Sequence, residues 1–368
     1  MGVEPMLVVI PTYRRTATLK WVLQSLVQCW TESIPESIRV LVVNNYPPAK
    51  EEITAIVSTF SHEKRFEWNI LHREKTLPPV ENWYSAIFEN AEPDEVVFIN
   101  SDDDLFLPWS LANRYSEIQR LRADCLLAQV DSGLFFYKQA SRVYYASRLC
   151  HLAKAGKDSA VLLNIGDIFF FDPVLISNHC YRNTAAFRAG FEKALSWCDA
   201  EDWLDCNTCR LMITVYLPYA LLLVGGAVAG LQRKCIIRGR ELEEIVEARY
   251  GVHGWNSGFA ILCALGVLGN TELRNIQELE PIRLQYRTEF TRLFLACLWD
   301  PRVDRAMFFE TLRRVEFPIS QLLSLKTLYG LRLILGDLLG LRGLWLRLVS
   351  AKRGIPAELF MKQLAELR

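Results

Sequence analysis

Short apolar runs alternate with stretches of helical periodicity over the first hundred residues. The predicted strands and helices follow one another at residues 7–10, 18–29, 40–43, 51–60, 68–72, 80–90 and 95–100. This alternation is typical of βαβ units, in which helices cover the faces of a parallel sheet. The pattern therefore predicts an α/β fold, with a Rossmann-like mixed sheet flanked by helices.

Three of the predicted strands end at polar turns, which begin at Pro11, Asn44 and Ser101. In open α/β sheets, ligands bind in the crevice beyond the carboxyl ends of the strands. We therefore expect these three turns to converge on one binding site.

The middle of the chain shows further apolar patterns. They favour strands at residues 125–136, 143–145 and 165–171 and a helix at residues 199–213. Pro218 and two glycines interrupt the apolar stretch 211–231. We therefore interpret residues 215–218 as a buried strand and not as part of a transmembrane helix.

Length and composition indicate a globular protein with two unequal domains. The chain has 368 residues, more than one hydrophobic core usually holds, and 51% of them are hydrophobic. Because the C-terminal third is mostly helical in pattern, we expect an α/β domain over residues 1–235 and a helical domain over residues 236–368. Basic and acidic residues balance at 42 each, which argues against a nucleic-acid partner.

A basic, leucine-rich segment occupies residues 321–353, where the single acid is Asp337. Such a segment can lie in the membrane interface, or it can form a helix packed on its own domain. The sequence leaves both interpretations open. Because the N-terminus has no secretion-signal pattern, we expect a cytoplasmic protein, either free or peripheral at the inner face of the cell membrane.

Three consecutive aspartates, Asp102, Asp103 and Asp104, directly follow the apolar run that ends near Asn100. Crowded carboxylates repel one another unless a cation neutralises them, and Mg²⁺ and Mn²⁺ prefer such oxygen ligands. A divalent cation there would bind a pyrophosphate and stabilise the charge on a departing nucleoside diphosphate. The alternative is a solvated acidic turn.

Taken in order, these elements resemble the family 2 glycosyltransferases, which have the GT-A fold. The resemblance covers residues 6–224. The residues that carry it are Ile10-Pro11-Thr12-Tyr13-Arg14-Arg15, Val42-Val43-Asn44-Asn45, Asn82, and the three aspartates followed by Leu105 and Pro108. The family often has an aspartate at the second strand end, where Asn44 and Asn45 stand in this chain.

The resemblance implies an inverting enzyme that moves a sugar from a nucleoside diphosphate sugar to a hydroxyl group. The nucleotide-sugar-binding residues that it implies are Pro11, Thr12, Tyr13, Arg14, Asn44, Asn45, Asn82, Asp102 and Asp103. It also implies Asp104 and Asp102 as ligands of Mn²⁺ or Mg²⁺. The basic tail favours a glycan or a polyprenyl-linked saccharide as acceptor, in the synthesis of a cell-surface polysaccharide.

Inverting transfer needs a general base that takes the proton from the acceptor hydroxyl. Glu201 and Asp202 resemble the Glu-Asp acceptor motif of the family. We expect Asp202 to be the base, with Glu201 as the second candidate. The alternative is ordinary acid enrichment in the first turn of a helix.

Basic residues gather at 232–234 and 238–240. They suit either a mobile loop that closes over the diphosphate or a solvated surface loop. Two other functions stay open: a nucleotide-sugar-binding scaffold without turnover, and a sugar nucleotidyltransferase. The second is disfavoured because the turn after the first strand lacks the glycine-rich phosphate loop of that class.

Overall fold

The computed structural model describes part of the chain, which folds into two compact units. The described residues are 4–35, 37–128, 134–138, 141–144, 159–171, 176–199, 213–241, 267, 269–280, 313 and 354–367. The first unit comprises residues 1–200, 205–241 and 354–368, and the second comprises residues 201–204 and 242–353. The first unit thus includes residues 236–241 and 354–368, which the sequence assigned to the helical domain.

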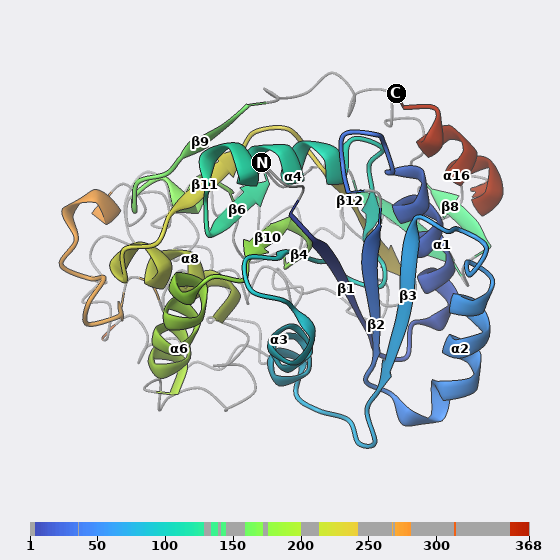
Figure 1. Cartoon of the computed structure of the whole chain (residues 1–368), viewed down its shortest axis with the longest axis horizontal. Coiled ribbons are helices and arrows are strands. Elements are labelled where there is room, and N and C mark those ends of the chain that lie inside the picture. Colours follow the sequence, from blue (N-terminus) through green and yellow to red (C-terminus); the bar gives the residue numbers. More distant parts are fainter. Residues whose placement is uncertain are drawn as a thin grey trace, which may run out of the picture. The chain divides into compact units, whose positions relative to one another are not determined.

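A mixed central sheet forms the core of the first unit (Figure 1). Within the described residues its strand order is β3-β2-β1-β4-β10-β6-β11-β9. Their bounds are β1 Met6–Thr12, β2 Ile38–Asn44, β3 Phe66–His72, β4 Val96–Ile99, β6 Cys125–Ala128, β9 Ala160–Leu162, β10 His179–Arg182 and β11 Val228–Leu231. Strands β1 to β4 are parallel, whereas β10 runs antiparallel to both β4 and β6. The predicted α/β class with a mixed sheet is confirmed.

Helices cover both faces of the sheet (Figure 1). The described helices are α1 Thr16–Gln28, α2 Lys50–Ser58, α3 Pro79–Asn90, α4 Ser110–Leu121, α6 Ala185–Asp199, α8 Ile213–Leu223 and α16 Ala357–Ala365. Val8 and Ile10 of β1 join the core cluster that α1 and α2 cover, whereas Leu7 and Val9 are buried outside that cluster. Burial on both faces explains why β1 reads as a continuous apolar run.

The predicted buried strand at residues 215–218 is wrong, because these residues lie inside helix α8. Every residue from Ile213 to Leu221 is buried, so the helix has no polar stripe to reveal its period. Helix α8 packs closely on α6 at Gly190, where an added Cβ would lie 2.8 Å from Leu221 Cδ2. The close packing of these two helices offsets the hydrogen bond that Pro218 cannot make.

One other expectation in this region also needs correction. Residues 165–171 do not form a strand, because Ile168–Phe171 is a 3₁₀ helix whose last residue packs across Gly230 of β11. The side chain of Asp167 accepts a hydrogen bond from the Asn164 backbone N–H at 3.2 Å, which favours a turn before this helix. The predicted helix at 199–213 lies mostly outside the described residues, and the described helix α6 precedes it.

A second sheet has the strand order β13-β8-β7-β12-β5 among the described residues. Its strands are β5 Leu105–Phe106, β7 Leu134–Lys138, β8 Arg142–Tyr144, β12 Ile236–Glu241 and β13 Ile355–Pro356. The basic residues 238–240, predicted as a loop, therefore belong to a strand. Because β12 pairs with β5 directly after the aspartates, it brings the Gly239 backbone to the candidate site.

None of the helices in the described part of the chain combines the length and the apolar character that spanning a bilayer requires. The basic segment 321–353 lies outside the described residues.

Candidate functional site

The three predicted turns meet at the carboxyl edge of the central sheet. Strand β1 pairs in parallel with both β2 and β4, so the carboxyl ends of these strands are neighbours. The Asn45 N–H donates to the Thr12 carbonyl at 3.0 Å, which joins the ends of β2 and β1. The Tyr13 N–H donates to Asp102 Oδ2 at 3.2 Å, which joins the end of β1 to the aspartates. The sequence therefore predicted this convergence correctly.

The aspartates form a buried turn, which we call the acid turn and define as Ser101 to Asp104. The exposed fractions of Asp102, Asp103 and Asp104 are 5%, 1% and 2%. The alternative of a solvated acidic turn is therefore wrong. Burial, followed by the neighbouring Asp103 charge, raises the pKa of Asp102 to about 7. Carboxylates in such a place need compensating charge or hydrogen bonds.

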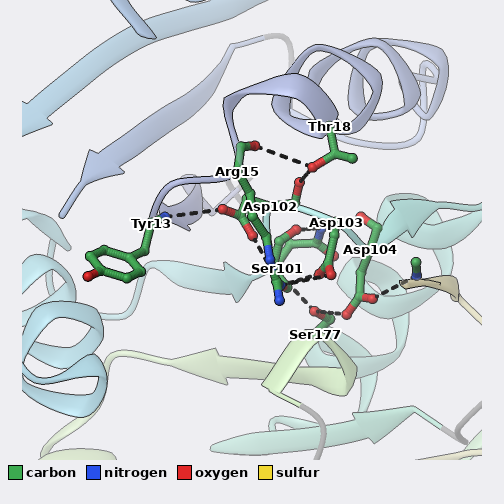
Figure 2. Close-up of polar contacts among 10 residues, drawn as sticks. Tyr13, Arg15, Thr18, Ser101, Asp102, Asp103, Asp104 and Ser177 are labelled. Carbon is green, nitrogen blue, oxygen red and sulfur yellow. Dashed lines mark hydrogen bonds and ion pairs between the residues drawn. The ribbon is translucent and has the colours of Figure 1, made fainter. Parts of the chain in front are cut away.

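Arg15 supplies positive charge to two of the aspartates (Figure 2). Its Nη1 lies 2.8 Å from Asp103 Oδ2 and 3.9 Å from Asp102 Oδ1. The Ser101 hydroxyl also donates to Asp103 Oδ1 at 2.7 Å. From the sequence, Arg14 is predicted as a nucleotide-binding residue, and Arg15 is given no role. The signal for Arg15 is the pair of consecutive arginines directly after a strand end.

Asp104 is bound differently from its two neighbours. Its Oδ2 accepts a hydrogen bond from the Ser177 hydroxyl at 2.7 Å, and its Oδ1 accepts one from the Gly239 N–H at 3.3 Å (Figure 2). The carboxylate thus ties the acid turn to the segment before β10 and to β12. Arg15 lies beside Asp102 and Asp103, whereas Ser177 and Gly239 donate to Asp104. The expected ligand pair of Asp104 and Asp102 stays a prediction.

A divalent cation at the acid turn stays a prediction, and Asp102 and Asp103 are the pair that already lies beside a positive charge. Within the described residues, no group of three or more His, Cys, Asp or Glu side chains has the arrangement of a metal site. Mg²⁺ is nevertheless often bound through only one or two carboxylates, with substrate phosphates and water as the other ligands. The Arg15 guanidinium already places a positive charge beside both carboxylates. Their oxygen chemistry and this stand-in cation suit Mg²⁺ or Mn²⁺.

Tyr13, Arg14 and Tyr46 form an aromatic and cationic group beside the acid turn. The Arg14 guanidinium carbon lies 5.0 Å from the centre of the Tyr13 ring and 4.9 Å from that of Tyr46. The two rings meet edge to face at 5.8 Å. The side chains of Tyr13 and Arg14 are exposed, whereas Pro11 and Thr12 are buried. Exposed rings can stack on a base and a nearby arginine can attract phosphate, so this group suits a nucleotide.

Asn44 and Asn45 lie at this edge, but their amide groups bind the protein itself. Asn44 Oδ1 accepts from the Tyr46 N–H at 2.9 Å, and its Nδ2 lies 3.1 Å from His72 Nδ1. Asn45 binds both the N–H and the carbonyl of Leu77 at 2.8 Å. Both side chains are buried. They hold the loops that border the site, and a direct contact with a nucleotide stays a prediction for them.

The remaining predicted residues have varied positions. Asn82 is buried on α3 and its Oδ1 accepts from Arg73 Nε at 3.2 Å, so its nucleotide contact also stays a prediction. Arg233 stacks on Trp109, with its guanidinium carbon 4.5 Å from the ring centre. The candidate bases Glu201 and Asp202 lie outside the described residues.

Comparisons with known proteins show that solved structures share the fold of this chain. No protein-family model and no curated protein matches this chain. Similar solved structures include S. aureus TarS 1-349 in complex with UDP-GlcNAc, at 15% identity and a TM-score of 0.50, covering 85% of this chain and 80% of that one. The complex of TarS 1-349 with UDP covers the same shares at 14% identity and a TM-score of 0.50. A longer S. aureus TarS chain gives 12% identity and a TM-score of 0.52, covering 86% of this chain and 50% of that one. At these identities the likeness shows a shared fold.

Proposed function

We propose that this protein is an inverting glycosyltransferase of family 2 that transfers a sugar from a nucleoside diphosphate sugar to a hydroxyl group. The observation that carries the proposal is the buried pair Asp102 and Asp103, joined by Arg15 to the end of β1. The TarS structures, which share the fold, hold UDP-GlcNAc and UDP. We therefore propose a uridine diphosphate sugar as the first donor to test.

Different described residues would bind the base, the metal ion and the diphosphate of the donor. Tyr13 and Tyr46 present rings for the base, and Arg14 places a positive charge between them. Asp102 and Asp103 would hold Mn²⁺ or Mg²⁺ on their carboxylate oxygens. When bound there, the ion stabilises negative charge on the leaving diphosphate. Asp104, Asn44 and Asn45 keep the surrounding loops in place.

The acceptor half of the proposal rests on residues that were named from the sequence. Asp202 would take the proton from the acceptor hydroxyl, with Glu201 as the second candidate. The basic segment 321–353 supports an acceptor at the inner face of the cell membrane, such as a lipid-linked saccharide for a surface polysaccharide. Asp202→Asn should abolish transfer and keep donor binding, and Glu201→Gln is its matched comparison. The anomeric configuration of the product, measured by NMR, tests inversion.

Release of nucleoside diphosphate by the purified protein tests the class of enzyme. The assay uses a panel of nucleotide sugars with Mn²⁺, Mg²⁺ or a chelator. Asp103→Asn is the test variant, and Asp94→Asn is the control because Asp94 is an exposed acid before β4. We expect metal-dependent release from one donor, lost in Asp103→Asn and retained in Asp94→Asn. Donor binding without release would instead indicate a scaffold, and pyrophosphate release from a nucleoside triphosphate would indicate a nucleotidyltransferase.

A further inference from the structure

Arg15 occupies the position at the acid turn that a divalent cation would need. One of its nitrogens, Nη1, lies within 2.8 Å of Asp103 Oδ2 and 3.9 Å of Asp102 Oδ1. Both carboxylates are buried, whereas the Arg15 side chain is 32% exposed. The two carboxylates are thus buried, whereas the Arg15 guanidinium that contacts them belongs to a partly exposed side chain.

A guanidinium and a divalent ion would compete for these two carboxylates. Mg²⁺ binds oxygen at about 2.0–2.1 Å, well inside the distance at which an arginine nitrogen donates to oxygen. Two positive centres at one pair of oxygens would also repel each other. Metal binding at Asp102 and Asp103 should therefore favour movement of the Arg15 guanidinium away from them.

The start of helix α1 lies next to Arg15 and favours the binding of an anion there. Arg15 directly precedes α1, whose first residue is Thr16 and whose first turn has no acidic residue. The amino end of a helix favours anions, so a diphosphate beside the acid turn would lie near both this helix end and Arg15. Arginine binds phosphate through two parallel hydrogen bonds, and an Arg15 released from the carboxylates can turn its whole guanidinium to a phosphate.

We propose that Arg15 is a displaceable cation, which neutralises Asp102 and Asp103 in the metal-free protein and binds the donor diphosphate when a divalent ion replaces it. The proposal rests on the proposed donor site. Arg15 should then weaken the binding of the divalent ion and strengthen the binding of the diphosphate.

Mn²⁺ binding without nucleotide tests the first half of this proposal. Free Mn²⁺ is measured by electron paramagnetic resonance during titration of the wild type, Arg15→Gln and Lys20→Ala. Lys20 is an exposed cation on α1 and serves as the matched control. Arg15→Gln should bind Mn²⁺ roughly fivefold more tightly, because the competing charge is gone. Unchanged or weaker Mn²⁺ binding in Arg15→Gln, or no binding by either protein, would overturn the proposal.

UDP and uridine binding, measured by calorimetry in saturating Mn²⁺, tests the second half. Arg15→Gln should lose about tenfold in UDP affinity and keep its uridine affinity, and Arg15→Lys should recover part of the UDP loss. An equal loss for both ligands would show a merely structural role and refute the proposal. Because the Mn²⁺ titration needs no nucleotide, tighter Mn²⁺ binding by a protein that binds no nucleotide would support the competition between Arg15 and the metal. It would count against the diphosphate-binding role of Arg15 and against the proposed function.

Discussion

The Ser177 hydroxyl joins both ends of the acid turn, because it accepts a hydrogen bond from the Ser101 N–H at 2.8 Å and donates one to Asp104 Oδ2 at 2.7 Å. Ser177 is completely buried and directly precedes Asn178 and strand β10. The antiparallel half of the sheet therefore fixes the shape of a turn that belongs to the parallel half. Fixing the backbone at residue 101 and the carboxylate at residue 104 leaves Asp102 and Asp103 directed to Arg15.

Replacing Ser177 with alanine should destabilise the protein. The change leaves the Ser101 N–H and one oxygen of Asp104 buried without this partner, at a cost of about 1–3 kcal/mol in the free energy of unfolding. Urea unfolding measures the effect. Ser196→Ala is the control, because Ser196 is exposed and its hydroxyl bonds only locally, to the Lys193 carbonyl. Equal stability of the two variants would show that the bridge contributes little.

Asp103→Asn should mainly lower the Mn²⁺ affinity, whereas Asp104→Asn should mainly lower the stability of the protein. Asp103→Asn removes a proposed metal ligand, so Mn²⁺ affinity should fall at least tenfold, as measured by titration. Asp104→Asn places an amide against the Ser177 hydroxyl and the Gly239 N–H, so it should mainly lower the free energy of unfolding, by roughly 2 kcal/mol. Folded Asp104→Asn protein should bind Mn²⁺ nearly as the wild type does. The reverse pattern would restore Asp104 as the ligand.

The sequence located the acid turn but could not assign its side chains. The apolar run before it and the βαβ rhythm placed three strand ends together, since parallel strands align their carboxyl ends. The direction of Asp104 depends on Ser177 and Gly239, which are 73 and 135 residues away along the chain. Such contacts leave no local periodicity. The amides of Asn44 and Asn45 likewise contact His72 and Leu77, and the contact of these asparagines with a nucleotide stays a prediction.

Helix α8 shows a second limit of the sequence patterns. Amphipathic helices such as α1 reveal themselves because a polar face meets solvent. In α8 the buried residues run without interruption to Leu221, and Pro218 adds a misleading break signal. The structure shows that this buried run packs as a helix on α6, where Leu221 lies close to Gly190.

Tyr13→Ala should weaken nucleotide binding without harming the fold. The Tyr13 side chain is 43% exposed at the end of β1, so its loss leaves no buried cavity. If its ring stacks on the base, UDP and uridine should lose affinity by a similar factor, about tenfold for a stacking contribution of 1–3 kcal/mol. Calorimetry measures both ligands, and Tyr13→Phe should retain most of the affinity. A loss confined to UDP would instead assign the tyrosine to the diphosphate.

The stability of the protein at mildly acidic pH should depend on His72. Its Nδ1 lies 3.1 Å from Asn44 Nδ2 and its Nε2 lies 3.2 Å from Thr54 Oγ1. Desolvation, with the positive charge of Lys50 as a smaller cause, lowers the pKa of His72 below its usual value. The folded state therefore binds the proton less tightly than the unfolded chain does. The stability that the neutral imidazole contributes is present above the unfolded pKa of about 6.5 and is lost as the pH falls through the folded pKa.

His72→Gln should reduce this loss of stability between pH 7.5 and pH 5, because glutamine does not titrate. The free energy of unfolding, measured by urea at several pH values, gives the slope for each protein. His62→Gln is the matched control, since the His62 side chain is 72% exposed. Similar slopes in the wild type and His72→Gln would mean that protonation of His72 does not oppose folding. A flatter slope in His72→Gln alone would show that protonation of His72 causes the loss of stability. His72 contacts Asn44, which in turn binds the Tyr46 backbone.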